Sequence, residues 1–190
     1  RSTLPGGPNW FANADGFGGE PIPNFEKVLK APDANGVGEY LVADVDGPGA
    51  IVRLWTAAIS SSVRMYLDGS TTPIYEGSAD DFFRRPYDRF GQMNAIDADR
   101  FGRTVCQRDA SYAPIPFAKA LRVTWTGSLR QIHFYHFQVR LYEQGAPVVT
   151  FQPDDIRTYR QTIDRVTQAL ADPDAAALAP GASAPQPLSE

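Results

Sequence analysis

The sequence predicts an all-β fold, a β-sandwich of the jelly-roll kind that ends in one α-helix. Short runs of alternating apolar and polar residues recur between residues 39 and 142, as in strands that bury one face. There are also 16 glycines and 16 prolines among the 190 residues, about 17% against an average near 12%. This excess supplies the many turns that a sandwich of short strands requires.

Seven stretches have the pattern of strands. They are residues 39–45, 50–57, 63–67, 73–75, 112–115, 120–125 and 131–142. The Asp-Gly-Pro-Gly sequence at 46–49 and the Asp-Gly pair at 68–69 are typical of turns between strands. In the second stretch, Ile51, Arg53 and Trp55 are expected on one face of the strand, opposite Leu54.

Four segments are expected along the chain. They are an arm rich in Gly, Pro and Asn at 1–38, the sandwich at 39–152, a helix at 153–171, and a linker or disordered tail rich in Ala and Pro at 172–190. The helix carries an apolar stripe at spacings of three and four residues: Ile156, Tyr159, Ile163, Val166 and Leu170. Within the sandwich, residues 77–110 are expected to be a long loop, with one helical turn capped by Ser78.

Composition excludes several classes of protein. A pI near 5.2 argues against a protein that grips nucleic acid phosphates, and no apolar run reaches the 18 or so residues of a membrane helix. The first nine residues lack the apolar core of a signal peptide, and a single cysteine, Cys106, excludes an internal disulfide. We expect a soluble protein, and the choice between a cytoplasmic and a periplasmic or secreted bacterial protein stays open.

The residues suggest no cofactor and no metal site. The two histidines, His133 and His136, are three residues apart in a predicted strand, so they point to opposite faces and cannot share a metal ion. Each is more simply explained as a packed or surface histidine than as a catalytic base. Cys106 has no histidine at a readable spacing and is interpreted as a structural thiol.

Two groups of residues have the chemistry of sugar binding. Trp10, Asn13 and Asp15 lie in the arm, where the ring would stack on a sugar and the polar groups would bind hydroxyls. The alternative is an aromatic anchor that pins the arm to the sandwich. Arg53 and Trp55 share a predicted strand face, and Gln138 and Arg140 raise the same question on the last strand. For Arg53, a buried ion pair and a substrate contact are both open.

Six stretches together resemble the family first called domain of unknown function 2961, now glycoside hydrolase family 172. They are NWFANAD at 9–15, GEYLVAD at 38–44, DGPGAIVRLW at 46–55, RMYLDG at 64–69, YAPIPFAK at 112–119 and FYHFQVR at 134–140. The resemblance runs from about residue 9 to about residue 167. It implies two jelly rolls in one chain, assembly through trimers, and retaining cleavage of α-fructofuranosides or arabinofuranosides by two glutamates near a contact between subunits.

The resemblance covers the first jelly roll, and the family's catalytic glutamates belong to the second. We therefore assign no catalytic residue to this chain and expect Trp10, Asn13, Asp15, Arg53, Trp55, His136 and Gln138 as substrate contacts. A fragment, a subunit of a cleaved precursor and a natural single-roll protein remain open, with the first two favoured. The alternative function is a non-catalytic carbohydrate-binding or capsid-like assembly module. An isolated first roll should expose an apolar patch and be oligomeric or poorly soluble.

Overall fold

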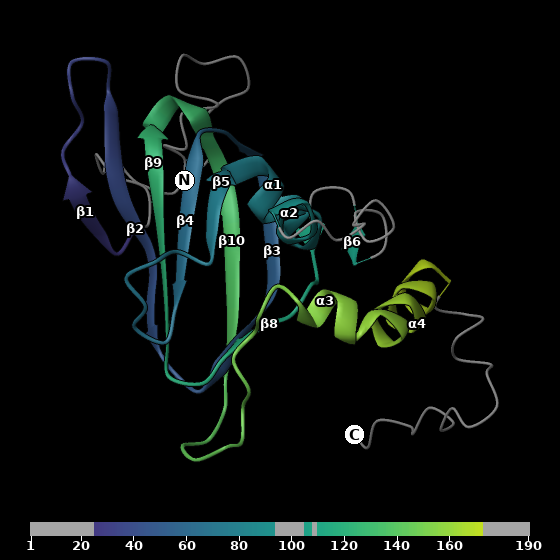
Figure 1. The fold of residues 1–190 in the computed structure, drawn as a ribbon. Helices are drawn as coiled ribbons and strands as arrows, with labels where there is room; N and C mark the ends of the chain where they lie inside the picture. Colours follow the sequence, from purple (N-terminus) through teal and green to yellow (C-terminus); the bar gives the residue numbers. More distant parts are fainter. Residues whose placement is uncertain (1–24, 94–104, 108–109, 173–190) are drawn as a thin grey trace, which may run out of the picture.

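The computed structural model describes residues 25–93, 105–107 and 110–172. In this part of the chain the strands form two antiparallel sheets that pack into a β-sandwich, with the helices at one side (Figure 1). The predicted all-β sandwich is therefore confirmed. No helix within the described ranges is both long enough and apolar enough to cross a membrane.

Each of the two sheets has five strands in the described part of the chain. The first sheet has the order β1 (Lys27–Lys30), β2 (Val37–Asp46), β9 (Ala120–Ser128), β4 (Ser62–Leu67) and β5 (Tyr75–Ser78). The second sheet has the order β10 (Ile132–Leu141), β3 (Gly49–Ile59), β7 (Ala110–Ser111) and β6 (Cys106–Gln107), and β8 (Ile115–Phe117) also pairs with β3. The chain passes between the sheets from β2 to β3 to β4, and β9 returns between β2 and β4. Such crossings are typical of Greek-key sandwiches.

The core between the sheets is rich in aromatic rings. Tyr40 and Trp125 of the first sheet are fully buried and stack with ring centroids 5.6 Å apart. Helix α1 (Ala79–Arg84) adds Phe82, which stacks on Phe137 of β10 at 6.4 Å. The next residue, Phe83, is also completely buried. The amphipathic helical turn thus completes the core at one side of the sandwich.

The turn predicted at 46–49 connects β2 to β3 and contains a cis peptide bond between Gly47 and Pro48. A side chain cannot replace the hydrogen at Gly49, because a Cβ there would lie 2.7 Å from the ring of Phe117 and 2.9 Å from the carbonyl oxygen of Arg140. The close approach of β8 and β10 therefore explains why glycine stands at this position.

One predicted face assignment is wrong. Ile51 is completely buried, whereas Arg53 and Trp55 lie half-buried on the outer side of the second sheet, and Leu54 points into the core. The register explains the difference, since Gln138 pairs with Arg53 but Val139 pairs with Ile51. Val52 is thus an extra residue, a β-bulge that reverses the alternation between Ile51 and Arg53.

Several elements were not predicted, among them strand β6 in the segment expected to be a long loop. Strand β1 lies in the segment expected to be irregular, and helix α2 (Pro86–Met93) lies in the segment expected to be a long loop. The four residues of β1 are too few to show a period. Helix α2 is held by tertiary packing, because Tyr87 and Phe90 are buried against Phe151, with ring centroids 5.8 and 4.9 Å away. The helical turn predicted after Ser78 is confirmed as α1.

The predicted helix at 153–171 is two shorter helices. Helix α3 (Asp155–Thr158) and helix α4 (Arg160–Ala171) are separated at Tyr159, whose ψ of 19° is not helical. Ile156 is fully buried and Ile163 is half-buried, but Tyr159, Val166 and Leu170 are 58%, 44% and 46% exposed. The apolar stripe therefore packs on its own domain only in part.

Candidate functional site

Strands β3 and β10 bring separately predicted site residues together. The two strands are antiparallel neighbours, with Trp55 opposite His136 and Arg53 opposite Gln138. The bulge at Val52 turns Arg53 and Trp55 to the outer face, and His136 and Gln138 are exposed on the same face. Four of the seven predicted contacts thus form one cross-strand group.

The rings and the guanidinium of this group are in contact. The centroids of Trp55 and His136 are 5.1 Å apart, with a tilt of 51° between the rings. The Arg53 Nη1 atom lies 3.4 Å from His136 Nδ1, and Arg53 Cζ lies 5.9 Å from the centroid of the Tyr112 ring. We call Arg53, Trp55, Tyr112, His136 and Gln138 the aromatic–arginine cluster.

As a hydrogen bond, the contact between Arg53 and His136 requires one particular tautomer of the neutral histidine. A guanidinium has only donors, so Nδ1 of His136 accepts the hydrogen bond and the ring proton is on Nε2. The Nε2–H group remains available to donate to a ligand. The cluster therefore offers an aromatic face beside several hydrogen-bond donors, which is the combination that sugars require.

The structure bears on the two readings of Arg53. The side chain is half-buried, and within the described residues it forms no ion pair. Its observed neighbours are His136 and the ring of Tyr112. A buried structural ion pair is therefore not what holds Arg53 in the described part of the structure.

Tyr112 was missed as a site residue. It directly follows β7, whose two residues pair with Leu54 and Trp55 of β3. That pairing carries Tyr112 to Arg53, but a two-residue strand after a long connection leaves no periodic signal in the sequence. Only its exposure, 37%, and its contact with Arg53 identify it.

The other predicted site residues are less informative. Trp10, Asn13 and Asp15 lie outside the described residues, and so do their expected sugar contacts. His133 occupies a position in β10 opposite Ala58, and Cys106 begins β6. No group of three or more potential metal ligands occurs among the residues that the structure describes.

Two glutamates of the first sheet, Glu39 and Glu76, are not arranged as a glycosidase pair. Glu39 of β2 and Glu76 of β5 belong to the same sheet, with β9 and β4 between them. Three strand spacings make about 14 Å, whereas a retaining pair needs about 5–5.5 Å. Glu76 is also 2.7 Å from the Nε atom of Arg64. These two glutamates therefore cannot act together on one glycosidic bond.

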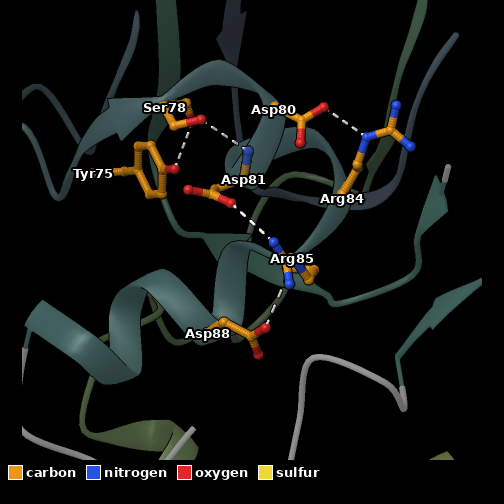
Figure 2. Close-up of polar contacts among 7 residues, drawn as sticks. All are labelled: Tyr75, Ser78, Asp80, Asp81, Arg84, Arg85 and Asp88. Carbon is orange, nitrogen blue, oxygen red and sulfur yellow. Dashed lines mark hydrogen bonds and ion pairs between the residues drawn. The ribbon is translucent and has the colours of Figure 1, made fainter. Parts of the chain in front are cut away.

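A second charged group lies around α1 and is structural (Figure 2). Ser78 Oγ accepts a hydrogen bond from the Asp81 amide at 3.2 Å, which caps the helix, and the Tyr75 hydroxyl donates to the Ser78 carbonyl oxygen at 2.8 Å. Asp80 and Asp81 are each paired with an arginine one turn later, at 2.7 and 3.3 Å, as Figure 2 shows. This arrangement holds the helix beside the sheet edge.

An apolar groove lies between helices α3 and α4 and the strands β3 and β8. Its volume is about 410 Å³. The lining residues are mostly aromatic, aliphatic or proline, namely Ala50, Tyr87, Pro114, Pro116, Tyr142, Val149, Phe151, Ile156, Tyr159 and Ile163. Ala50 is three residues from Arg53 along β3, and Pro114 is two residues from Tyr112. The apolar groove therefore borders the aromatic–arginine cluster.

Comparison with known protein families gives a match that spans the described sandwich. A family model described as the first β-sandwich domain of GH172 matches residues 1–159, a range that includes every strand of the described residues and most of the lining of both sites described above. No curated protein matches the chain.

Proposed function

Because the chain belongs to glycoside hydrolase family 172, whose first β-sandwich domain it forms, we propose that it is the sugar-contacting half of a retaining enzyme that cleaves furanosides. The substrates would be α-fructofuranosides or arabinofuranosides. The catalytic nucleophile and the acid/base, both glutamates, would lie on a second β-sandwich, either in the same polypeptide or in a separate chain. The spacing of Glu39 and Glu76 supports a division of labour in which this half binds and the other half cleaves.

The observation that carries the proposal is the convergence of Arg53, Trp55 and His136. In the proposed complex the Trp55 ring stacks on the furanose, while Arg53 and the Nε2–H group of His136 donate to its hydroxyl oxygens. Gln138 supplies an amide that can both donate and accept. Trp10, Asn13 and Asp15 belong to the same proposal as further sugar contacts.

These contacts would serve a two-step reaction on the partner domain. A glutamate attacks the anomeric carbon while the glutamic acid gives its proton to the leaving oxygen. A water molecule then attacks the same carbon and gives its proton to the second glutamate, which breaks the bond to the nucleophile and releases the sugar. Rigid sugar contacts on strands keep the anomeric carbon in line for both steps. The aromatic–arginine cluster therefore contributes orientation rather than bond cleavage.

The apolar groove would be covered by the second β-sandwich. It is lined by Tyr142, Val149 and Tyr159, which are 37%, 81% and 58% exposed, and such a patch is typical of a contact with another protein surface. Because the groove borders the aromatic–arginine cluster, a domain seated there would bring its glutamates to the edge of the sugar site. Assembly into trimers would add a further subunit to the same region.

The first experiment is an intact-mass spectrum and a denaturing gel of the protein purified from its source. A longer polypeptide, or a second chain in fixed ratio, is expected. A single species at 20.8 kDa would contradict the proposal and would favour a carbohydrate-binding or assembly module.

The second experiment measures hydrolysis of aryl α-fructofuranoside and aryl arabinofuranoside by that assembled protein. Trp55→Ala and Arg53→Ala should each lower kcat/KM by about 10- to 100-fold, equivalent to about 1.4–2.7 kcal/mol of transition-state binding. Arg130→Ala, an exposed arginine after β9, is the matched control and should leave kcat/KM unchanged. Equal activity of all three variants would remove the aromatic–arginine cluster from the active site.

A further inference from the structure

A polar groove lies on the other side of the sandwich, on the outer face of the first sheet. Its volume is about 410 Å³, within the range of small-molecule sites. Strands β2, β9 and β4 and the turn after β4 line it, and its principal polar residues are Glu39, Asp44, Tyr66, Ser70, Arg122 and Thr124. We call it the polar groove.

Strand register sets these side chains in a row. Arg122 of β9 pairs with Asp44 of β2 on one side and with Tyr66 of β4 on the other. Cross-strand partners on one face lie about 5 Å apart, so a carboxylate, a guanidinium and a phenol ring follow one another across three strands. The row therefore presents an acceptor, a donor and an aromatic face in succession.

Thr124 brings an unpaired buried hydroxyl to the polar groove. It lies two residues from Arg122 on β9, on the same face of the sheet, and it lines the polar groove. The residue is only 3% exposed, and its Oγ1 atom has no hydrogen-bond partner in the structure. An orphaned buried hydroxyl costs about 1–3 kcal/mol, so a hydroxyl-bearing ligand would remove a real penalty.

The charges define the class of ligand. Glu39, Asp44 and Arg122 give the lining a formal charge of about −1, which disfavours phosphates, sulfates and acidic sugars. Glu39 and Asp44 are five residues apart on one strand, or about 13–17 Å, which is too far for a retaining carboxylate pair. Mixed donors and acceptors beside a half-exposed tyrosine ring suit a neutral polyol.

We propose that the polar groove is a second, non-catalytic site that binds a neutral glycan chain. Tyr66 stacks on a sugar ring. Arg122 and Asp44 bind neighbouring hydroxyls of the glycan, and the Thr124 hydroxyl accepts a hydrogen bond from the glycan. This proposal rests on the proposed function only in that both sites would bind the same class of substrate. It lies on the opposite sheet from the aromatic–arginine cluster, so it would hold the polymer while another segment is cut.

The test is affinity gel electrophoresis and calorimetry of the 190-residue chain with inulin, a fructofuranose polymer, and with arabinan. Tyr66→Ala and Arg122→Ala should each weaken binding by about tenfold or more. Arg130→Ala, an exposed arginine outside the polar groove, is the matched control and should retain binding to the polymer. Circular dichroism of each variant establishes that it is folded.

Thr124→Val separates ligand binding from folding. Because the native hydroxyl is unpaired in the free protein, valine should leave the Tm unchanged or raise it, while glycan binding weakens. A lower Tm together with unchanged binding would overturn the role given to Thr124.

Two results would overturn the proposal as a whole: no binding of either polymer by the wild-type chain, or unchanged binding after Tyr66→Ala and Arg122→Ala. The proposed function is judged separately, by hydrolysis of a short aryl furanoside in the assembled protein. That activity should be insensitive to Tyr66→Ala and sensitive to Trp55→Ala, so the two proposals can fail independently.

Discussion

The two outer faces of the sandwich differ in chemistry although both are built on five-stranded antiparallel sheets. The first sheet presents a polar face on which Glu39, Asp44 and Arg122 line an open groove. The second presents aromatic rings and an arginine, and beside them an apolar groove under α3 and α4. The outer face of the first sheet is therefore suited to solvent and a glycan chain, and that of the second sheet to a furanoside and another protein surface.

This difference has an energetic consequence. On the second sheet the helices are attached by buried apolar side chains, each of which contributes kilocalories to folding. On the first sheet the outer face is held by exposed polar pairs, which contribute little. Mutations on the two faces should therefore have effects of very different size.

The largest effect is expected for Ile156→Ala. Ile156 is completely buried in α3, and it is where the helices pack on the sandwich. Removing its side chain leaves a cavity and should lower the free energy of unfolding by about 2–4 kcal/mol. Urea denaturation followed by circular dichroism measures this. Leu170→Ala, at a position that is 46% exposed, should cost less than about 1 kcal/mol, and equal losses at both positions would contradict the packing described here.

The next largest effect is expected for Asp68→Asn, which weakens the hydrogen bonds that connect the end of β4 to the segment before α3. Asp68 accepts hydrogen bonds from the amides of Lys119 and Ala120, at 2.7 and 3.2 Å, and from the Thr150 hydroxyl, in the segment that leads to α3. Burial alone would raise the pKa of Asp68, but these hydrogen bonds outweigh it and hold the pKa below the ordinary value of 3.8. The variant should lose about 1–3 kcal/mol at pH 7.

The pH dependence of that loss has a definite sign. Because the folded-state pKa is depressed, the stabilisation is complete above the unfolded value and disappears as the pH falls through the folded value. The difference between wild type and Asp68→Asn should therefore be constant from neutral pH down to about pH 5 and shrink below pH 3.8. Urea midpoints across this range measure it, and a gap that widens in acid would show that the carboxylate does not stabilise the fold.

A smaller effect is expected for Tyr159→Lys in the apolar groove. Tyr159 is 58% exposed and would be covered in any oligomer that uses this groove. A lysine there should weaken self-association of the chain by about tenfold, or about 1.4 kcal/mol, as seen by analytical ultracentrifugation. Tyr66→Lys on the polar face is the matched control and should not change the association constant. A strictly monomeric wild-type chain would contradict the predicted oligomer.

The sequence was most informative where local pattern and fold agree. The alternation in residues 131–142 predicts His136 and Gln138 on the face opposite Tyr135 and Phe137, and β10 has this arrangement because it is regular over that stretch. The turn at 46–49 was also found, since its glycines and proline have few other uses. Capping by Ser78 was predicted from its side-chain chemistry alone.

Sequence reasoning failed where tertiary contacts decide. The bulge at Val52 is visible only in the pairing of β3 with β10, and without it Arg53 would share the buried face of Ile51. A single sequence does not reveal that Tyr112 contacts Arg53, because periodicity does not encode the order of the strands. For the same reason it does not reveal the row formed by Asp44, Arg122 and Tyr66. The break between α3 and α4 at Tyr159 also leaves no signal in the sequence, since the apolar spacing continues across it.

The smallest effect is expected for the ion pair between Arg64 and Glu76 on the outer face of the first sheet. Their side chains are 44% and 54% exposed, and Nε and Oε1 are 2.7 Å apart. Good geometry does not make such a pair strong, because water screens the charges and two flexible side chains must be ordered. A double-mutant cycle with alanine at both positions should give a coupling of about 0.2–1 kcal/mol that falls in 1 M NaCl, where the Debye length is about 3 Å. Arg84 and Asp80, also 2.7 Å apart but 22% and 45% exposed, form a reference pair less open to solvent, for which we expect a coupling at least as large and less sensitive to salt. If instead the Arg64–Glu76 coupling exceeded about 2 kcal/mol and resisted salt, the polar face would contribute to the stability of the fold as the helical face does, and the energetic contrast between the two faces would not hold.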